Sequence, residues 1–491
     1  MTPTEEGYAQ AAELRDSSRL PQLDLLRGFA ILCMLFISIW EFGGFSNNQQ
    51  LFYRTGTHGG NFNLLTTVSV LFEGKMRALL ALVFGAGIVL YVSQKTKEQD
   101  PRYPDLYIRR MIWLGVFGLI NAFVMLWHGD ILFNYACTGI LLFPFWRMKP
   151  RGLLIASLVL TLIYCGKIYW AYAEDQASYR KYLAIQRVEK SFAGADSVKK
   201  KTIDSLLQVE KKDPLSGLLS GDTLLRRHRR DTLTSKQQSD KQAWENLLKG
   251  SKYDSTADKS EQKTLQADSY TEIWSYQAER SQRRESFWFY RIGIWDIGSM
   301  VFLGMALFGF GFFGSGWPAR HYLLPALIGI AGAFALGWLR NYLLVEKGLD
   351  YAKYLDHHLI GPTQFFPIER FCAAVGYAAL LMWLHRISWL RYCRQAVEAV
   401  GRMALSNYLL QCILGTVIFF GYGMGYFGHL TQWQLYLVVA EMILLQVLFS
   451  VLWLRFFYIG PAEWLLRSLV LRKKQPLVRP ASGETVNNIV H

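Results

Sequence analysis

Two short strings of the sequence carry charged side chains in spacings that suit the binding of a charged substrate. Asp24 and Arg27 are three residues apart and face one side of a helix. A guanidinium there could grip a phosphate or a carboxylate, and a local ion pair is the alternative. Glu73 and Arg77 are four residues apart and share a face, whereas Lys75 lies off it. Both strings stand at the start of an apolar run, which must position them.

A third string, His128-Gly129-Asp130, is typical of a tight turn between two apolar runs, with Asn134 one helical turn further on. In the structural interpretation, Asp130 caps the helix that follows. In the functional alternative, Asp130 orients His128 as a general base beside a substrate. His128 and Asp130 are therefore candidates for catalysis, and Asn134 is a candidate for substrate binding.

Polar side chains also gather toward the C-terminal end of the chain. Asn407 and Gln411 are four residues apart on one helix face, and Arg402 precedes them. Hydrogen bonds between helices explain this pair structurally, and substrate contact is the alternative. Glu463 and Arg467 form a further pair at i,i+4 spacing.

Other motifs that would specify a chemistry are absent from the sequence. It contains no P-loop, no HExxH and no GxSxG. The string Asp356-His357-His358 lacks a third ligand at helical spacing, so we expect no metal site. The basic cluster at 226–230 lies in a segment expected outside the cytoplasm, so nucleic acid is not an expected partner.

The composition indicates the elements that carry these residues. Of 491 residues, 52% are hydrophobic and only 19% are charged, which excludes disorder and a disulfide-rich scaffold. Residues 174–285 hold 40 of the 91 charged side chains, so a polar insert interrupts an apolar body. Ten apolar runs are long enough to cross a bilayer core of about 30 Å as helices. They are 25–42, 76–94, 110–127, 131–147, 152–173, 289–313, 322–343, 371–390, 403–422 and 433–457.

Lysine and arginine in the loops orient these spans. The loop 95–110 carries two lysines and three arginines and the loop 386–402 carries four arginines, whereas 128–130 and 423–432 contain neither residue. Ten helices with both termini in the cytoplasm place the rich loops inside and the insert outside. We therefore expect an all-α polytopic transmembrane bundle of about ten helices in a lipid bilayer, with a helical extracytoplasmic insert. The expected parts are a cytoplasmic segment 1–24, five-helix bundles 25–173 and 286–467, the insert 174–285 and a basic tail 468–491.

Several strings, taken together, resemble the YeiB-like family of bacterial membrane proteins. They are LDLLRGFAIL, FEGKMRALLALVFGAGIVLY, RRMIWLGVFGLINAFVMLWHGDILFNYACTGI, FLGMALF and the stretch from GRMALSNYLLQ through GYGMGYFG to GPAEWLLR. The opening D-x-L-R-G helix is also similar to that of membrane acyltransferases of the heparan-glucosaminide acetyltransferase type. The resemblance implies a protein of the bacterial inner membrane. It also implies an acyl group passed from cytoplasmic acyl-CoA to an extracytoplasmic hydroxyl or amine of a small molecule or glycan.

The resemblance also implies roles for particular residues. Arg27, Arg110 and Arg402 are the implied cytoplasmic contacts for the acyl-CoA diphosphate. The acceptor site is expected to be lined by charged residues of two strings: Glu73, Lys75, Arg77, His128 and Asp130.

Two positions depart from the family pattern. The pattern usually has Asn where this chain has Ser38, and His where it has Asn121. In the acyltransferase relatives, an Asn near the end of the first helix and a following His serve the chemistry. Ser38 keeps a hydroxyl as a hydrogen-bond partner or acyl relay. His58 in the next outer loop could then serve as the general base.

Two other functions stay open at this point. A transporter would use the same polar helix ends as a substrate path, although the sequence shows no paired repeats and no proton-relay carboxylates deep in the spans. A membrane-anchored sensor or interaction protein would use the insert 174–285 as its binding module.

Overall fold

The structure, a computed structural model, describes residues 20–44, 59–97, 101–210, 233–252, 254–314, 316–387 and 390–478. Within these ranges the chain forms helices and one isolated β-bridge, as the predicted all-α class requires. The chain divides into two compact units. The first comprises Met1–Gly166, Asp254–Tyr342 and Pro362–His491, and the second comprises Lys167–Tyr253 and Leu343–Gly361. The predicted insert is therefore shared between the two units.

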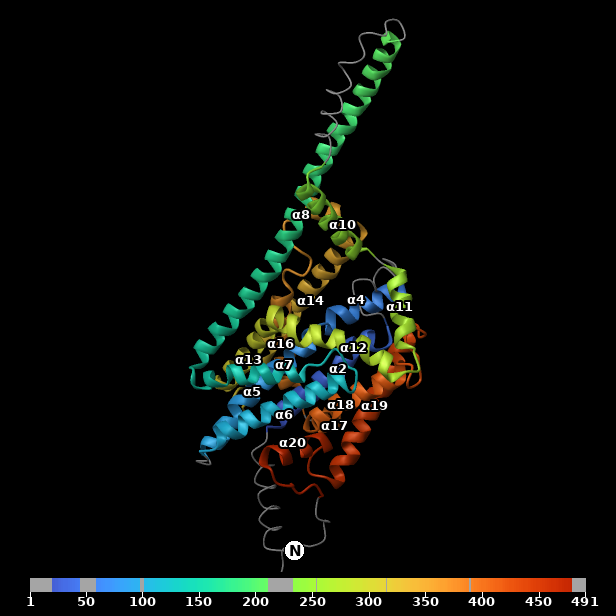
Figure 1. The fold of residues 1–491 in the computed structure, drawn as a ribbon. Coiled ribbons are helices and arrows are strands. Elements are labelled where there is room, and N and C mark those ends of the chain that lie inside the picture. The colour runs from blue at the N-terminus through green and yellow to red at the C-terminus, as the bar shows by residue number, and fades with distance from the viewer. Residues whose placement is uncertain are drawn as a thin grey trace, which may run out of the picture. The chain divides into compact units, whose positions relative to one another are not determined.

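The first unit holds most of the apolar helices (Figure 1). Its N-terminal part contains α2 (Pro21–Gly43), α4 (Gly60–Phe72), α5 (Lys75–Lys97), α6 (Tyr103–Phe123), α7 (Leu132–Leu142), the 3₁₀-helix η1 (Phe143–Arg147) and the start of α8 (Pro150–Glu210). Its later part contains α11 (Ser255–Leu265), α12 (Tyr270–Arg283), the π-helix η2 (Arg284–Gly293), α13 (Ile294–Gly309), most of α14 (Arg320–Leu349), α16 (Phe366–Leu384), α17 (Arg391–Arg402), α18 (Ala404–Phe419), α19 (Gln432–Phe456) and α20 (Pro461–Leu471).

The described residues include eight helical segments long and apolar enough to cross a membrane, or nine if α17 and α18, bent by 82°, count as one span. This confirms the predicted polytopic helical bundle. The predicted span over 131–147 differs, because it forms the eleven-residue α7 followed by η1, which contains Pro144. Eleven residues rise only about 16 Å. The run is apolar enough to span, but proline cannot continue the α-helical hydrogen bonds.

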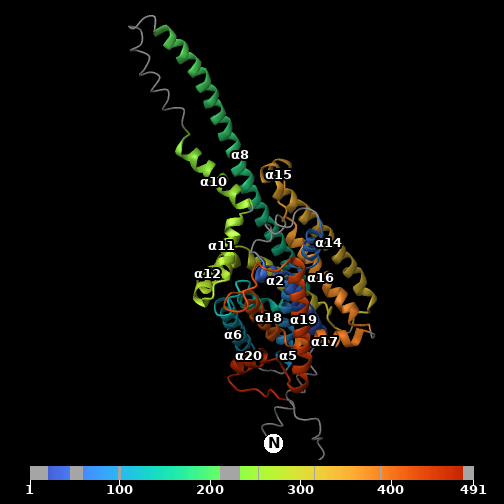
Figure 2. The ribbon, with the colours of Figure 1, turned by 90° about the vertical axis from the view of Figure 1, so that its right-hand side faces the viewer.

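Glycine residues allow two close helix crossings in the first unit, α2 with α17 and α5 with α13. A Cβ atom on Gly401 of α17 would lie 1.8 Å from the carbonyl oxygen of Asp24 on α2. A Cβ atom on Gly85 of α5 would lie 2.0 Å from the carbonyl oxygen of Val301 on α13. Glycine at these two crossings therefore lets the helix backbones approach each other closely. Helix α2 also contacts α16, α18 and α19, which surround it in Figure 2.

The second unit has a small aromatic core of its own. It is formed by part of α8, the end of α14, α10 (Ser235–Ser251) and α15 (Tyr351–His357). Trp244 is 1% exposed and its ring lies 4.8 Å from that of Tyr179. The Tyr351 hydroxyl donates to Asp175 at 2.5 Å, and the Tyr179 hydroxyl donates to Asp356 at 2.9 Å. The basic cluster at 226–230 lies outside the described residues.

Candidate functional site

The turn between α4 and α5 carries the first of two buried groups of charged side chains. Gly74 adopts a φ of +71°, which lets the chain change direction there. Glu73 accepts hydrogen bonds from Ser69 Oγ at 2.5 Å and from Arg340 Nη1 of α14 at 3.0 Å. Glu73 thus pairs with a residue 267 positions away, and not with Arg77 at i,i+4 spacing.

Lys75 and Glu369 complete this group. Lys75 Nζ lies 2.5 Å from Glu369 Oε1, and Arg340 Nε donates to Oε2 of the same carboxylate at 3.0 Å. Lys75 and Glu369 are each 1% exposed. The two acids and two bases sum to zero charge, and each has an opposite partner, as burial requires. We call Glu73, Lys75, Arg340 and Glu369 the ion-pair cluster.

A further buried pair lies beside the ion-pair cluster. Arg370 Nε of α16 donates to the Gly74 carbonyl at 2.9 Å, and Nη1 of the same guanidinium pairs with Asp296 of α13. The guanidinium carbons of Arg340 and Arg370 lie 5.1 Å and 5.5 Å from the ring centroid of Phe366. These contacts join α5, α13, α14 and α16 around one turn.

The π-helix η2 presents the second group, in which Glu285 is buried and Arg284 is half-buried. π-helical segments occur frequently at functional sites. Glu285 is 7% exposed, yet neither of its carboxylate oxygens has a hydrogen-bond partner among the described residues. Nε of Arg284 is likewise unpartnered there, and the guanidinium lies 4.7 Å from the Trp288 ring centroid. Because a buried polar group without a partner is costly, this arrangement calls for a functional explanation.

His128 belongs to the same region. Its Nε2 lies 3.2 Å from Nη2 of Arg280 and 3.7 Å from Glu41, and Arg280 also pairs with Glu261 at 2.8 Å. Since arginine can only donate, Nε2 is the acceptor and the ring proton is assigned to Nδ1. That nitrogen has no partner among the described residues. Burial, with Arg280 and Arg284 nearby, holds the pKa of His128 well below its usual value, so the ring is neutral at pH 7.

Asp130 holds the turn that positions His128. Its Oδ2 accepts the backbone N–H of Phe133, in the first turn of α7, at 3.0 Å, although the N-cap residue of α7 is Ile131 and not Asp130. Its Oδ1 accepts from Asn121 Nδ2 at 2.8 Å and from the Tyr408 hydroxyl at 3.2 Å. Burial raises the pKa of Asp130 to about 6, against the effect of these donors. Asn121, one of the two predicted departures from the resemblance, therefore contacts the Asp130 carboxylate directly.

Arg77 lies between the two groups. It forms no ion pair with any residue that the structure describes. It lies within electrostatic range of two arginines and two acids: Arg284, Arg370, Glu41 and Asp296. Arg284 in turn interacts electrostatically with His128 and Glu285. We call Arg77, His128, Arg284 and Glu285 the open cluster. Its members come from α5, the 128–130 turn and η2, so tertiary packing alone brings them together.

The three predicted diphosphate contacts lie on three helices. Arg27 pairs with Asp24 at 2.9 Å, which agrees with the local ion-pair interpretation. Arg110 of α6 lies within electrostatic range of Arg27, so two like charges meet at this end of α2. Arg402 donates to the carbonyl of Tyr458 at 3.4 Å. Contact of these arginines with an anion stays a prediction.

The polar residues of α18 have partners on a neighbouring helix. Asn407 Nδ2 donates to Ser450 Oγ at 2.8 Å, and the Asn407 carbonyl accepts from Gln446 at 2.9 Å. Both partners lie on α19, so interhelical hydrogen bonding is confirmed for Asn407. Gln411 is 2% exposed, and its role in substrate binding stays a prediction.

Three further predicted residues stand in different places. Ser38 is half-buried on α2, one turn before Glu41, and therefore shares the helix face that approaches His128. Asn134 is buried in the first turn of α7, and its side-chain oxygen has no partner among the described residues. His58 lies outside the described residues.

Four buried charged residues were not predicted as site residues, although they lie in or beside predicted spans: Asp296, Arg340, Glu369 and Arg370. An ionisable residue inside an apolar run is a signal that would have selected them. Asp296 is one example: it lies within the predicted span 289–313, is 4% exposed and pairs with Arg370.

Comparison with known proteins gives uncharacterised bacterial relatives. A family model described as "Protein of unknown function (DUF418)" matches residues 303–473. The "Uncharacterized protein YxaH" of Bacillus subtilis (strain 168) is 25% identical over 479 residues, which cover 94% of this chain and 97% of that protein. The "Uncharacterized protein YeiB" of Escherichia coli (strain K12) is 25% identical over 482 residues, which cover 94% of this chain and 98% of that protein. No solved structure matches the chain.

Proposed function

We propose that this YeiB-like integral membrane protein transfers an acyl group, and that the open cluster is where the acceptor is activated. The matches along nearly the whole chain confirm the YeiB-like resemblance that the motifs predict. The observation that carries the proposal is the Glu285 carboxyl. It is buried, it has no hydrogen-bond partner among the described residues, and it lies within electrostatic range of Asp130 and Arg284.

The open cluster contains the groups that such a transfer needs. The acceptor hydroxyl or amine gives its proton to Glu285 as its oxygen or nitrogen attacks the acyl carbon. Glu285 suits this role better than His128, because His128 Nε2 already accepts from Arg280. The bond from the acceptor to the acyl carbon forms, the carbon–sulfur bond breaks, and the released thiolate takes up a proton as free CoA. Arg77 and Arg284 supply positive charge for the carbonyl oxygen as it becomes negative.

Helix α2 carries residues of both the expected donor site and the expected acceptor site, near its opposite ends. Arg27, the expected diphosphate contact, and Glu41, which lies beside His128, are fourteen residues apart on one helix. At 1.5 Å per residue they are separated by about 21 Å. A donor held near Arg27 and an acceptor held near the open cluster would therefore approach from opposite ends of the helix. Ser38 lies between them, one turn from Glu41.

Transfer of labelled acetyl groups tests this proposal. Purified protein is added to bacterial membrane vesicles with labelled acetyl-CoA, and both free thiol and label in the lipid and glycan fractions are measured. Glu285→Gln is expected to lower the rate by about 10²–10⁴-fold, since it removes the proton acceptor. Glu279→Gln is the matched control, because Glu279 is exposed and pairs with exposed Arg283 at 2.6 Å. A wild-type rate no higher than that of vesicles alone, or an unchanged rate in Glu285→Gln, would overturn the proposal.

A transporter is a second candidate, favoured by the buried Asp296–Arg370 pair. The two side chains are 5% and 3% exposed and join α13 to α16. Ionisable residues inside spans commonly line substrate or proton paths. Substrate flux into proteoliposomes without thiol release would support transport in place of acyl transfer. Loss of that flux in Asp296→Asn, with flux kept in Glu285→Gln, would assign the path to this pair.

A further inference from the structure

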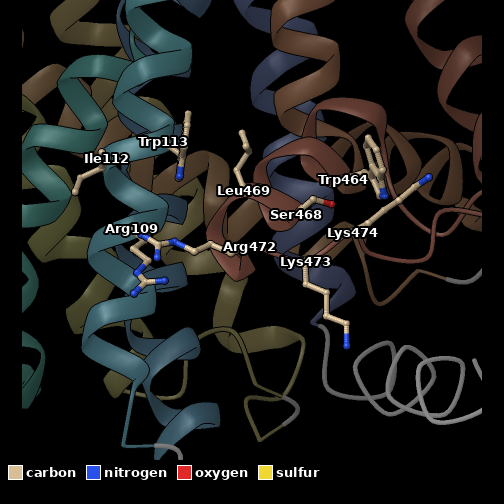
Figure 3. Close-up of a pocket in the computed structure, with 9 residues that line it drawn as sticks. All are labelled: Arg109, Ile112, Trp113, Trp464, Ser468, Leu469, Arg472, Lys473 and Lys474. Carbon is tan, nitrogen blue, oxygen red and sulfur yellow. The ribbon is translucent and has the colours of Figure 1, made fainter. Parts of the chain in front are cut away.

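A basic pocket of about 620 Å³ lies between α6 and α20 in the first unit (Figure 3). Of the nine described side chains that line it, four are cationic and none is acidic. Arg109 belongs to α6, whereas Arg472, Lys473 and Lys474 follow the end of α20. Figure 3 shows Arg472 reaching from the end of α20 toward Arg109. Two separate elements thus bring like charges to one hollow.

The backbone at Arg472 has a conformation that few arginines adopt. Its φ is +51°, in the left-handed region, where glycine is the usual residue at the end of a helix. The Arg472 N–H donates to the Leu469 carbonyl at 3.3 Å, and the Lys473 N–H donates to the Ser468 carbonyl at 3.1 Å. Glycine would make the same turn with less strain, so the turn itself does not explain an arginine side chain here.

The segment that follows α20 is fixed on both sides of the lysines. The Gln475 N–H donates to Ser468 Oγ at 3.3 Å, and the Trp464 indole donates to the Gln475 carbonyl at 2.8 Å. Further along, the Tyr458 N–H donates to the Leu477 carbonyl at 3.0 Å. The cations are therefore held on an ordered loop, which lowers the entropy that a ligand must overcome on binding.

We infer that this pocket binds the phosphate group of a ligand. Guanidinium groups bind phosphate oxygens through paired hydrogen bonds, and lysines add point charge. Arg109 also pairs with half-exposed Asp105 at 2.8 Å, which orients one edge of its guanidinium. Trp113 and Trp464 line the same hollow, so it can also cover an apolar or planar part of the ligand.

The phosphate can belong to the headgroup of an anionic lipid or to a soluble phosphorylated solute. Basic pockets between membrane helices suit lipid headgroups. Soluble phosphates offer the same oxygens without an acyl chain. The inference does not rest on the acyl-transfer proposal, because the pocket shares no residue with the open cluster.

Two binding measurements separate the sources. Protein in phosphatidylcholine nanodiscs is titrated with inorganic pyrophosphate by calorimetry. In parallel, native mass spectrometry counts phosphatidylglycerol and phosphatidylcholine molecules that remain bound to the detergent-purified protein. Pyrophosphate binding identifies a soluble ligand, and selective retention of phosphatidylglycerol identifies a lipid headgroup. Either result supports the inference, and the absence of both overturns it.

Arg472→Gly tests the pocket without disturbing the turn. Glycine suits the left-handed backbone, so the melting temperature is expected to stay the same or rise. The affinity of the variant for phosphate is expected to be at least tenfold lower. Raised salt concentration should also lower the affinity of the wild-type protein. Arg151→Gln, at an exposed arginine on α8, is the matched control and should bind as the wild type does. Equal binding by wild type and Arg472→Gly would overturn the assignment.

Discussion

Helix α5 contributes one residue to each of the two clusters. The charged side chains are paired in the ion-pair cluster and lack close ion-pair partners in the open cluster. Lys75 lies 2.5 Å from Glu369 in the ion-pair cluster, whereas Arg77 forms no ion pair among the described residues. Positions two apart on an α-helix point in nearly opposite directions, at about 200°. The first group joins helices. The second keeps charges available next to Glu285, at a cost in stability that proteins commonly accept at functional sites.

The largest expected effect comes from breaking the ion-pair cluster. Glu369→Gln leaves Lys75 and Arg340 buried without their carboxylate, so the free energy of unfolding should fall by about 3–5 kcal/mol. Thermal unfolding in detergent measures the change. Replacing a pair together, as in Lys75→Met with Glu369→Leu, should cost clearly less than Glu369→Gln alone. If the double variant is the less stable of the two, unpaired buried charge is not the reason that Glu369→Gln lowers stability.

A pH-dependent effect of intermediate size is expected from Asp130. Its pKa in the folded protein is raised from 3.8 to about 6, so the folded state holds the proton more tightly than the unfolded state. Stability from this group is therefore lost as pH rises from about 4 to 6, by up to about 3 kcal/mol. The difference in melting temperature between wild type and Asp130→Asn, followed across this range, measures it. A difference that does not change with pH would contradict the raised pKa.

His128 should show the opposite sign. Its pKa is lowered in the folded protein, so protonation favours the unfolded state and stability falls as pH drops below about 6.5. His128→Asn is expected to remove this acid-side loss. The same melting series, extended with this variant, separates it from the Asp130 effect. An equal acid-side loss in both proteins would place the titrating group elsewhere.

Glu285→Gln should change stability in the other direction from Glu369→Gln. It breaks no hydrogen bond among the described residues, and it replaces a buried ionisable group with a neutral one. The free energy of unfolding is expected to stay the same or to rise by about 1–2 kcal/mol. Activity would fall while the fold is kept. A loss of stability as large as that in Glu369→Gln would mean that the two clusters do not differ.

The smallest effect is expected at the surface. Glu279 and Arg283 pair at 2.6 Å with side chains 65% and 76% exposed. Exposed pairs contribute little, so Glu279→Gln should change the free energy of unfolding by less than about 0.5 kcal/mol. This value sets the scale for the buried variants. A larger loss would show that this part of α12 is covered in the membrane.

The helices were predictable because each span requires a long apolar run, and such runs are visible in one sequence. The short α7 was not predicted, since hydropathy alone does not weigh Pro144, which interrupts the α-helical hydrogen bonds. The hydrogen bond from the Phe133 N–H to Asp130 was also predictable in kind, because it joins residues three apart, although the N-cap residue itself is Ile131.

The partners of the site residues were not predictable in the same way. Glu463 is expected to pair with Arg467 one turn away, yet its carboxylate accepts from Leu405 N–H at 2.7 Å and Ser406 Oγ at 2.5 Å at the start of α18. Burial raises the pKa of Glu463. Glu73 likewise pairs with Arg340. Helix spacing predicts local neighbours, whereas packing selects distant ones when both groups are withdrawn from water.

The π-helix η2 interrupts one forty-residue helical segment, Tyr270–Gly309. Its wider turns change the phase between α12 on one side and α13 on the other. Removing a single residue from it would rotate α12 by about 100° relative to α13. Arg280, on α12, would then leave His128, although every residue of α13 would keep its place. In this protein the length of one segment, and not only its composition, decides which side chains meet at the site.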